Sequence, residues 1–107
     1  MGTTAMSTET TERLVAPAHL GLQSRTDFRH QAVTILERLP AGTGRLVLDL
    51  SDTRQVDSAG LGALMLIQRK AAERRQAVVL RSANEELRFL LVLTRLDDLF
   101  ELDPPVR

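Results

Sequence analysis

The chain has 107 residues, with 14 basic and 14 acidic side chains and no net charge at neutral pH. This length suits one domain with a single core, and the balanced charge offers no electrostatic basis for binding nucleic acid or a membrane surface. Cysteine is absent, which excludes disulfides and thiolate metal sites and is consistent with a cytoplasmic location.

The first twelve residues are polar and rich in threonine, without the basic start and apolar stretch of a signal peptide. We expect residues 1–12 to form a disordered leader, residues 13–103 to form the domain, and residues 104–107 to form a short tail. No apolar run approaches the roughly 20 residues of a membrane-spanning helix, so direct membrane insertion is not expected.

Short apolar runs alternate with amphipathic stretches along the rest of the chain. Residues 14–18 predict a strand at a sheet edge or with a bulge, because Pro17 cannot donate a ladder hydrogen bond. A helix with one apolar stripe is expected from about residue 24 to Leu39, and Pro40 and the glycines after it end it. Further elements are expected in chain order: a strand covered on both faces at 45–50, a helix at 58–75, a buried strand at 77–80, a helix opened by a capping box at 82–85, and an edge strand at 99–102.

Strands that alternate with helices imply parallel pairing through right-handed crossovers. The sequence therefore predicts a small α/β domain, with a mostly parallel sheet of about four strands flanked by about three helices. In such sheets the binding surface lies at the carboxyl ends of the strands. The loop 51–58 is expected to emerge at that end.

Ser58 stands at the expected start of a helix and has two possible roles. Its hydroxyl could cap the helix by accepting a free backbone N–H. It could instead be exposed and receive a phosphate, which the positive end of the helix dipole favours. Gly60 and Gly62 follow, although glycine in a helix costs up to about 1 kcal/mol relative to alanine. They indicate either close internal packing or a surface that another molecule approaches closely.

Other candidate sites have ordinary structural explanations. Asp49, Asp52 and Asp57 match no calcium-loop spacing, and each suits a turn or a strand end. The two histidines have no evident partner in the sequence and are assigned structural roles. No nucleophile is paired with a base in a known motif, so neither enzyme activity nor a cofactor is expected. The basic residues near the end of the helix at 58–75 complement its dipole or form a small patch for an acidic partner: Arg69, Lys70, Arg74 and Arg75.

Two stretches carry a resemblance to a known family. The run Leu46-Val-Leu-Asp-Leu-Ser-Asp52, followed by Val56-Asp-Ser-Ala-Gly-Leu-Gly-Ala-Leu64, resembles the STAS domain family, which includes anti-sigma factor antagonists and domains of sulphate transporters. The resemblance extends from about residue 14 to residue 102. It implies a small sheet flanked by helices, in agreement with the alternation of elements.

The resemblance also implies a function. In antagonists of this type, an anti-sigma factor that is also a serine kinase phosphorylates the serine after the aspartate, which is Ser58 here. The unmodified protein binds the anti-sigma factor and frees the sigma factor, and the phosphorylated protein lets go. This implies a bacterial phosphoprotein in transcription regulation, with ATP bound by the kinase. The expected partner-binding residues are Asp52, Thr53, Arg54, Asp57, Ser58, Ala59, Gly60, Leu61 and Gly62.

One segment departs from the antagonist pattern. Many antagonists have Gly-Glu-Leu-Asp where this chain has Ala18-His-Leu-Gly21, without either acidic residue, and the segment before it is short. Both features resemble STAS proteins outside the sigma cascade, such as the small subunit of bacterial lipid-transport ABC systems. The alternative function is therefore an unswitched accessory subunit that binds an ABC transporter ATPase. A nucleotide-handling enzyme ranks last, since it would need motifs that the chain lacks.

Overall fold

Four parallel strands form the main sheet, in the order β1-β3-β5-β6. The computed structural model describes residues 10–105. The strands are β1 (Thr11–Val15), β3 (Arg45–Asp49), β5 (Ala77–Arg81) and β6 (Glu101–Asp103). A separate two-stranded parallel pair joins β2 (His19–Leu20) to β4 (Gln55–Val56). The expected parallel sheet of about four strands is confirmed.

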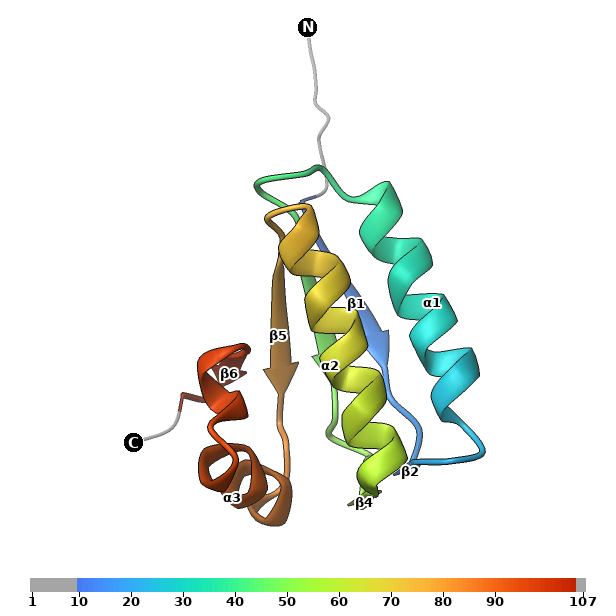
Figure 1. The fold of residues 1–107 in the computed structure, drawn as a ribbon, viewed down its shortest axis with the longest axis vertical. Helices are drawn as coiled ribbons and strands as arrows, with labels where there is room; N and C mark the ends of the chain where they lie inside the picture. The colour runs from blue at the N-terminus through green and yellow to red at the C-terminus, as the bar shows by residue number, and fades with distance from the viewer. Residues whose placement is uncertain (1–9, 106–107) are drawn as a thin grey trace, which may run out of the picture.

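Within residues 10–105, three α-helices accompany the sheet: α1 (Arg25–Arg38), α2 (Ser58–Glu73) and α3 (Glu85–Leu93). The 3-10 turn η2 (Leu96–Asp98) follows α3. Helices α1 and α2 lie side by side over one face, and both begin at the end where the strands finish (Figure 1). Helix α3 lies near the carboxyl end of β5 (Figure 1). None of the helices in residues 10–105 is long and apolar enough to cross a membrane.

The core lies between the sheet and the α1–α2 layer. Leu46 and Leu48 of β3 are buried there with Val78 and Leu80 of β5. The stripe expected on the first helix is buried as predicted: Phe28, Ala32, Ile35, Leu36 and Leu39. On α2, Leu64 and Ile67 are buried against the sheet, whereas Met65 is exposed.

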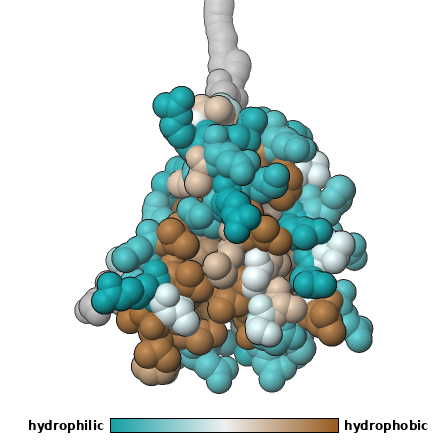
Figure 2. Space-filling model, viewed as in Figure 1, coloured by the Kyte–Doolittle hydropathy of each residue, from teal (hydrophilic) through white to brown (hydrophobic). Residues whose placement is uncertain are grey.

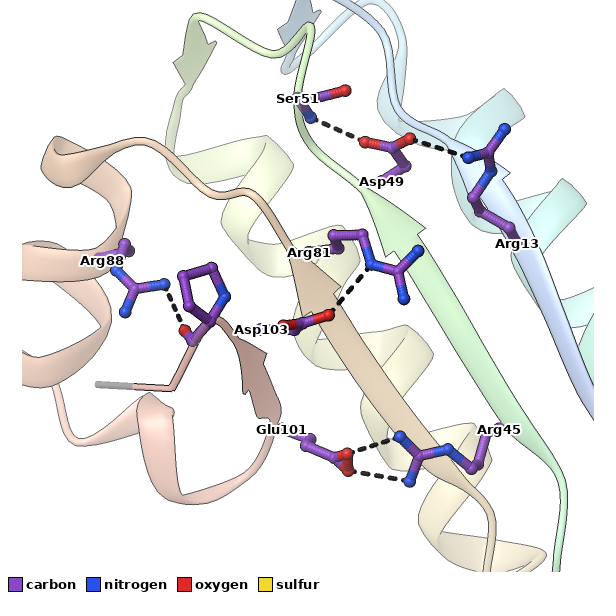
Figure 3. Close-up of polar contacts among 9 residues, drawn as sticks. Arg13, Arg45, Asp49, Ser51, Arg81, Arg88, Glu101 and Asp103 are labelled. Carbon is purple, nitrogen blue, oxygen red and sulfur yellow. Dashed lines mark hydrogen bonds and ion pairs between the residues drawn. The ribbon is translucent and has the colours of Figure 1, made fainter. Parts of the chain in front are cut away.

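The other face of the sheet carries ion pairs between its strands (Figure 3). Arg45 binds Glu101 through two hydrogen bonds of 2.9 and 2.6 Å, and Arg81 Nε lies 3.1 Å from Asp103 Oδ2. Val47 is nevertheless buried on this face. We attribute its burial to the aliphatic stems of the long charged side chains around it, which can cover apolar surface. The expected burial of β3 on both faces is confirmed, since Leu46 and Leu48 are buried on one face and Val47 on the other.

Several boundaries differ from the sequence-based expectation. Strand β1 begins at Thr11, inside the segment expected as leader, and ends before Pro17, whose missing N–H suits a position beyond the ladder. Residues 1–9 and 106–107 lie outside the described residues. Helix α3 is capped by Asn84 rather than Ser82, because Ser82 adopts a left-handed φ of 59° and Asn84 accepts the Leu87 N–H at 2.8 Å. Strand β6 lies slightly later than residues 99–102.

Candidate functional site

Asp57 organises the start of α2 at the carboxyl end of the sheet. Its Oδ1 accepts the Gly60 N–H at 3.0 Å, so Asp57 is the N-cap. Its Oδ2 accepts the Leu22 N–H at 3.3 Å and lies 3.4 Å from His19 Nε2. The Gly60 N–H is the main cause that lowers the pKa of Asp57, and the contacts with Leu22 and His19 act in the same direction.

Ser58 is therefore not the N-cap, and that expectation is wrong. It is the first helical residue, its side chain is exposed, and its hydroxyl has no hydrogen-bond partner among residues 10–105. Asp57 takes the capping position because its carboxylate reaches the N–H three residues on, as an aspartate at N-cap commonly does. The hydroxyl of Ser58 is left open to another molecule.

The two glycines of the first turns have different surroundings. A Cβ on Gly60 would collide with the carbonyl oxygen of Leu20, so this glycine allows β2 to pack against α2. A Cβ on Gly62 would meet nothing within 4 Å. Internal packing thus explains Gly60, whereas Gly62 leaves open space on the helix surface.

The remaining expected partner-binding residues differ in how far they are exposed to solvent. Asp52 and Arg54 are exposed, and Ala59 and Leu61 are partly exposed. Thr53 is only 5% exposed, and its Oγ1 donates to the Pro17 carbonyl at 2.8 Å. Thr53 and Gly60 therefore support the loop from inside, and the surface that another molecule could touch consists of the others.

Of the three aspartates considered as metal ligands, Asp57 caps α2 and Asp49 holds the turn after β3, whereas Asp52 is exposed. Asp49 Oδ1 accepts the Ser51 N–H at 2.9 Å, and Ser51 is the main cause that lowers the pKa of Asp49. The same carboxylate faces Arg13 across β1 and β3, at 3.6 Å (Figure 3). Within residues 10–105, no three His, Cys, Asp or Glu side chains form a group that could hold a metal ion.

Two features of this end of the molecule were missed in the sequence. His19 meets Asp57 only because β2 pairs with β4, and a two-residue strand leaves no periodic signal. A groove of about 440 Å³ also runs between β4 and α3, bordered by Phe89 and Leu93, which are 68% and 67% exposed. The apolar surface gathers over α3 in Figure 2. The apolar residues of this helix are too many for one buried face, and that excess could have indicated the groove.

Comparisons with known proteins agree with this fold. A family model described as "Mlab, STAS domain" matches residues 8–102. A proposed anti-sigma factor antagonist from Thermotoga maritima is 25% identical, with a TM-score of 0.70 over 84% of this chain and 77% of its own. A sulfate transporter family protein from Wolinella succinogenes is 16% identical, with a TM-score of 0.69 over 83% of this chain and 70% of its own.

The anti-sigma factor antagonist SpoIIAA, in its unphosphorylated form, has 16% identity and a TM-score of 0.65, over 83% of this chain and 79% of its own. The chain belongs to the STAS domain family, whose members are generally regulatory domains without enzyme activity. The family resemblance found in the sequence is thus confirmed.

Proposed function

We propose that this chain is an anti-sigma factor antagonist of the bacterial cytoplasm, switched by phosphorylation. In its unmodified form it binds an anti-sigma factor that is also a serine kinase, and phosphorylation of Ser58 ends the complex. The chain itself has no enzyme activity and needs no cofactor, because the kinase supplies ATP. It does not bind nucleic acid directly and affects transcription through its partner.

The exposed hydroxyl of Ser58 carries this proposal. A serine that capped α2 would lose a structural hydrogen bond on modification, but here Asp57 is the cap. A phosphate on Ser58 would therefore change the surface without unfolding the helix. Its docking surroundings are the exposed or partly exposed residues of the loop and first turns: Asp52, Arg54, Asp57, Ala59, Leu61 and Gly62.

The expected electrostatic effect is large enough for a switch. A phosphate adds about −1.5 to −2 charges at neutral pH. One unit-charge repulsion at 4 Å is worth about 1 kcal/mol in water and about 4 kcal/mol at an effective dielectric constant of 20. About 1.4 kcal/mol already changes affinity tenfold.

The test is to incubate the protein with candidate anti-sigma kinases and ATP and to locate phosphate by mass spectrometry. We expect modification at Ser58, none in Ser58→Ala, and normal modification in Ser51→Ala, which alters another exposed serine nearby. Calorimetry should then show tight binding of the unmodified protein and at least tenfold weaker binding of Ser58→Asp. Equal affinity of Ser58→Asp and wild type would contradict the switch.

Two observations favour a second candidate, an unswitched subunit of a lipid-transport ABC system. The first is that the chain matches the family model described as "Mlab, STAS domain". The second is that α3 carries exposed apolar residues. A subunit held permanently can bury such an apolar face in its partner. Co-purification with an ABC ATPase, lost in Phe89→Ser but kept in Ser58→Asp, would support this candidate over the first.

A further inference from the structure

A groove between α1 and α2 is lined by Ser58 and by three arginines. Arg25 and Arg29 lie one turn apart on α1, and Arg69 lies on the same face of α2 as Ser58. All four residues line one groove of about 340 Å³, in the seam where the two helices lie side by side (Figure 1). Within residues 10–105, none of the three arginines forms an ion pair, and no acidic residue lines the groove.

We propose that this groove binds an acidic segment of the partner protein, whose carboxylates pair with Arg25, Arg29 and Arg69. A guanidinium group presents a planar fork of donors that matches a carboxylate. The whole chain carries no net charge, so this concentration of three positive charges is local. Complementarity of charge therefore indicates a negatively charged occupant.

The uncharged lining favours a polypeptide as that occupant. Gly62 leaves space above α2, and Ala59 and Ala63 are small residues beside it. Met65 and Leu66 add apolar surface along the same groove. An acidic peptide can use both kinds of contact, whereas three cations are fewer than the four to eight basic residues typical of a lipid-binding cluster.

This inference rests on the proposed function and explains how the switch would act. Phosphate on Ser58 would bring a second anion to the groove that binds the acidic segment. It would neutralise part of the arginine charge and repel the carboxylates of the segment. The arginines would thus serve the partner in the unmodified state and the phosphate in the modified state.

The test is fluorescence anisotropy at low ionic strength with a labelled peptide of alternating glutamate and alanine. We expect Arg25→Glu combined with Arg29→Glu to weaken binding about tenfold or more, because two attractions become repulsions. Arg69→Glu should weaken it in the same direction. The control is Arg95→Glu, an exposed arginine outside the groove, which should bind within about twofold of wild type. Protein that carries phosphate on Ser58 should bind weakly, and Ser58→Ala normally.

Unchanged peptide binding in the groove variants, or an equal loss in Arg95→Glu, would overturn the proposal. The proposal would also be overturned if single-stranded RNA or phosphatidylserine vesicles bound more tightly than the peptide, with the same dependence on these arginines. The groove would then be a site for that other ligand. The two proposals can fail separately. If Ser58 phosphate still dissolves the kinase complex while the groove variants bind peptide normally, only the groove proposal fails. If no kinase modifies Ser58 but the peptide results hold, only the proposed switch fails.

Discussion

His19 Nε2 lies 3.4 Å from Asp57 Oδ2, so a short strand and the first turn of a helix share one carboxylate. The other oxygen of Asp57 caps α2 through the Gly60 N–H. Asp57 therefore fixes the position of Ser58, the next residue, without any contribution from the serine hydroxyl. Asp57 thus stabilises the start of the helix, whereas Ser58 is the proposed site of phosphorylation. Because the two roles lie on adjacent side chains, each can be altered by its own substitution.

Replacement of Asp57 should destabilise the fold. Asp57→Ala removes the cap and the contacts with Leu22 and His19, so we expect its melting temperature to fall by several degrees. Asp57→Asn should lose less, because asparagine is also a favoured N-cap. Thermal unfolding followed by circular dichroism measures both. An alanine variant that melts with wild type would show that Asp57 does not hold this turn.

Ser58→Ala should leave stability almost unchanged, within about 0.5 kcal/mol of wild type in urea unfolding. The reason is that the hydroxyl has no partner among residues 10–105 and alanine is a good helix former. A cost as large as that of Asp57→Ala, measured under the same conditions, would mean that the serine has a capping role after all.

The lowered pKa of Asp57 predicts a dependence of stability on acid. Folding favours the charged carboxylate, so its contribution is fully present above the ordinary pKa of 3.8 and is lost as the pH falls through the lower pKa of the folded state. The stability advantage of wild type over Asp57→Asn should therefore shrink as the pH falls below about 4. Carbon-detected NMR titration should give a pKa for Asp57 below 3.8. A normal or raised value would contradict the arrangement of donors around it.

The two glycines form a matched pair of tests. Gly60→Ala should destabilise by about 1–3 kcal/mol, because its Cβ would collide with the backbone of Leu20 and the neighbouring elements would have to shift. Gly62→Ala should be neutral or stabilising by up to about 1 kcal/mol, since its Cβ enters open space in a helix. Urea unfolding of both variants measures the two changes in the free energy of unfolding. Similar losses at the two positions would contradict the close packing at Gly60 and the open space at Gly62.

Local patterns predicted the main elements well. The apolar stripe of α1 and the short apolar runs of β3 and β5 arise from neighbouring residues, so their periods are visible in the sequence. The choice of cap at α2 was not visible, because Asp57 and Ser58 are adjacent and both residue types are favoured caps. The structure distinguishes them, since Asp57 accepts the Gly60 N–H and also contacts Leu22 and His19 of the segment at β2.

Contacts between distant residues explain most of what the sequence did not predict. His19 and Asp57 are 38 positions apart, and the paired strands that bring them together have two residues each. The arginines of the α1–α2 groove come from two helices whose relative rotation is set by packing. The sequence identified Arg69 as part of a basic cluster, but Arg25 and Arg29 join it only in three dimensions.

Gln76 is another such long-range contact and supports a last prediction. It lies buried just before β5, and its Nε2 donates to the carbonyls of Leu36, Leu39 and Pro40 at 2.8, 3.0 and 3.3 Å. The first two carbonyls belong to the last turn and C-cap of α1, where the helix itself supplies no N–H partners, and Pro40 follows directly. The single amide therefore joins the end of α1 to the connection between α2 and β5.

Gln76→Met keeps most of the side-chain volume but removes the donor, so the Leu36 carbonyl loses its partner. The carbonyls of Leu39 and Pro40 keep the donors Arg74 Nη2 and Gly44 N–H. We expect a loss of about 1–3 kcal/mol in the free energy of unfolding, the usual cost of leaving a buried polar group unsatisfied. Gln31→Met is the control, because Gln31 is exposed on α1 and should change stability by less than about 0.5 kcal/mol. If both variants unfold at the same urea concentration as wild type, the amide of Gln76 does not stabilise the end of α1.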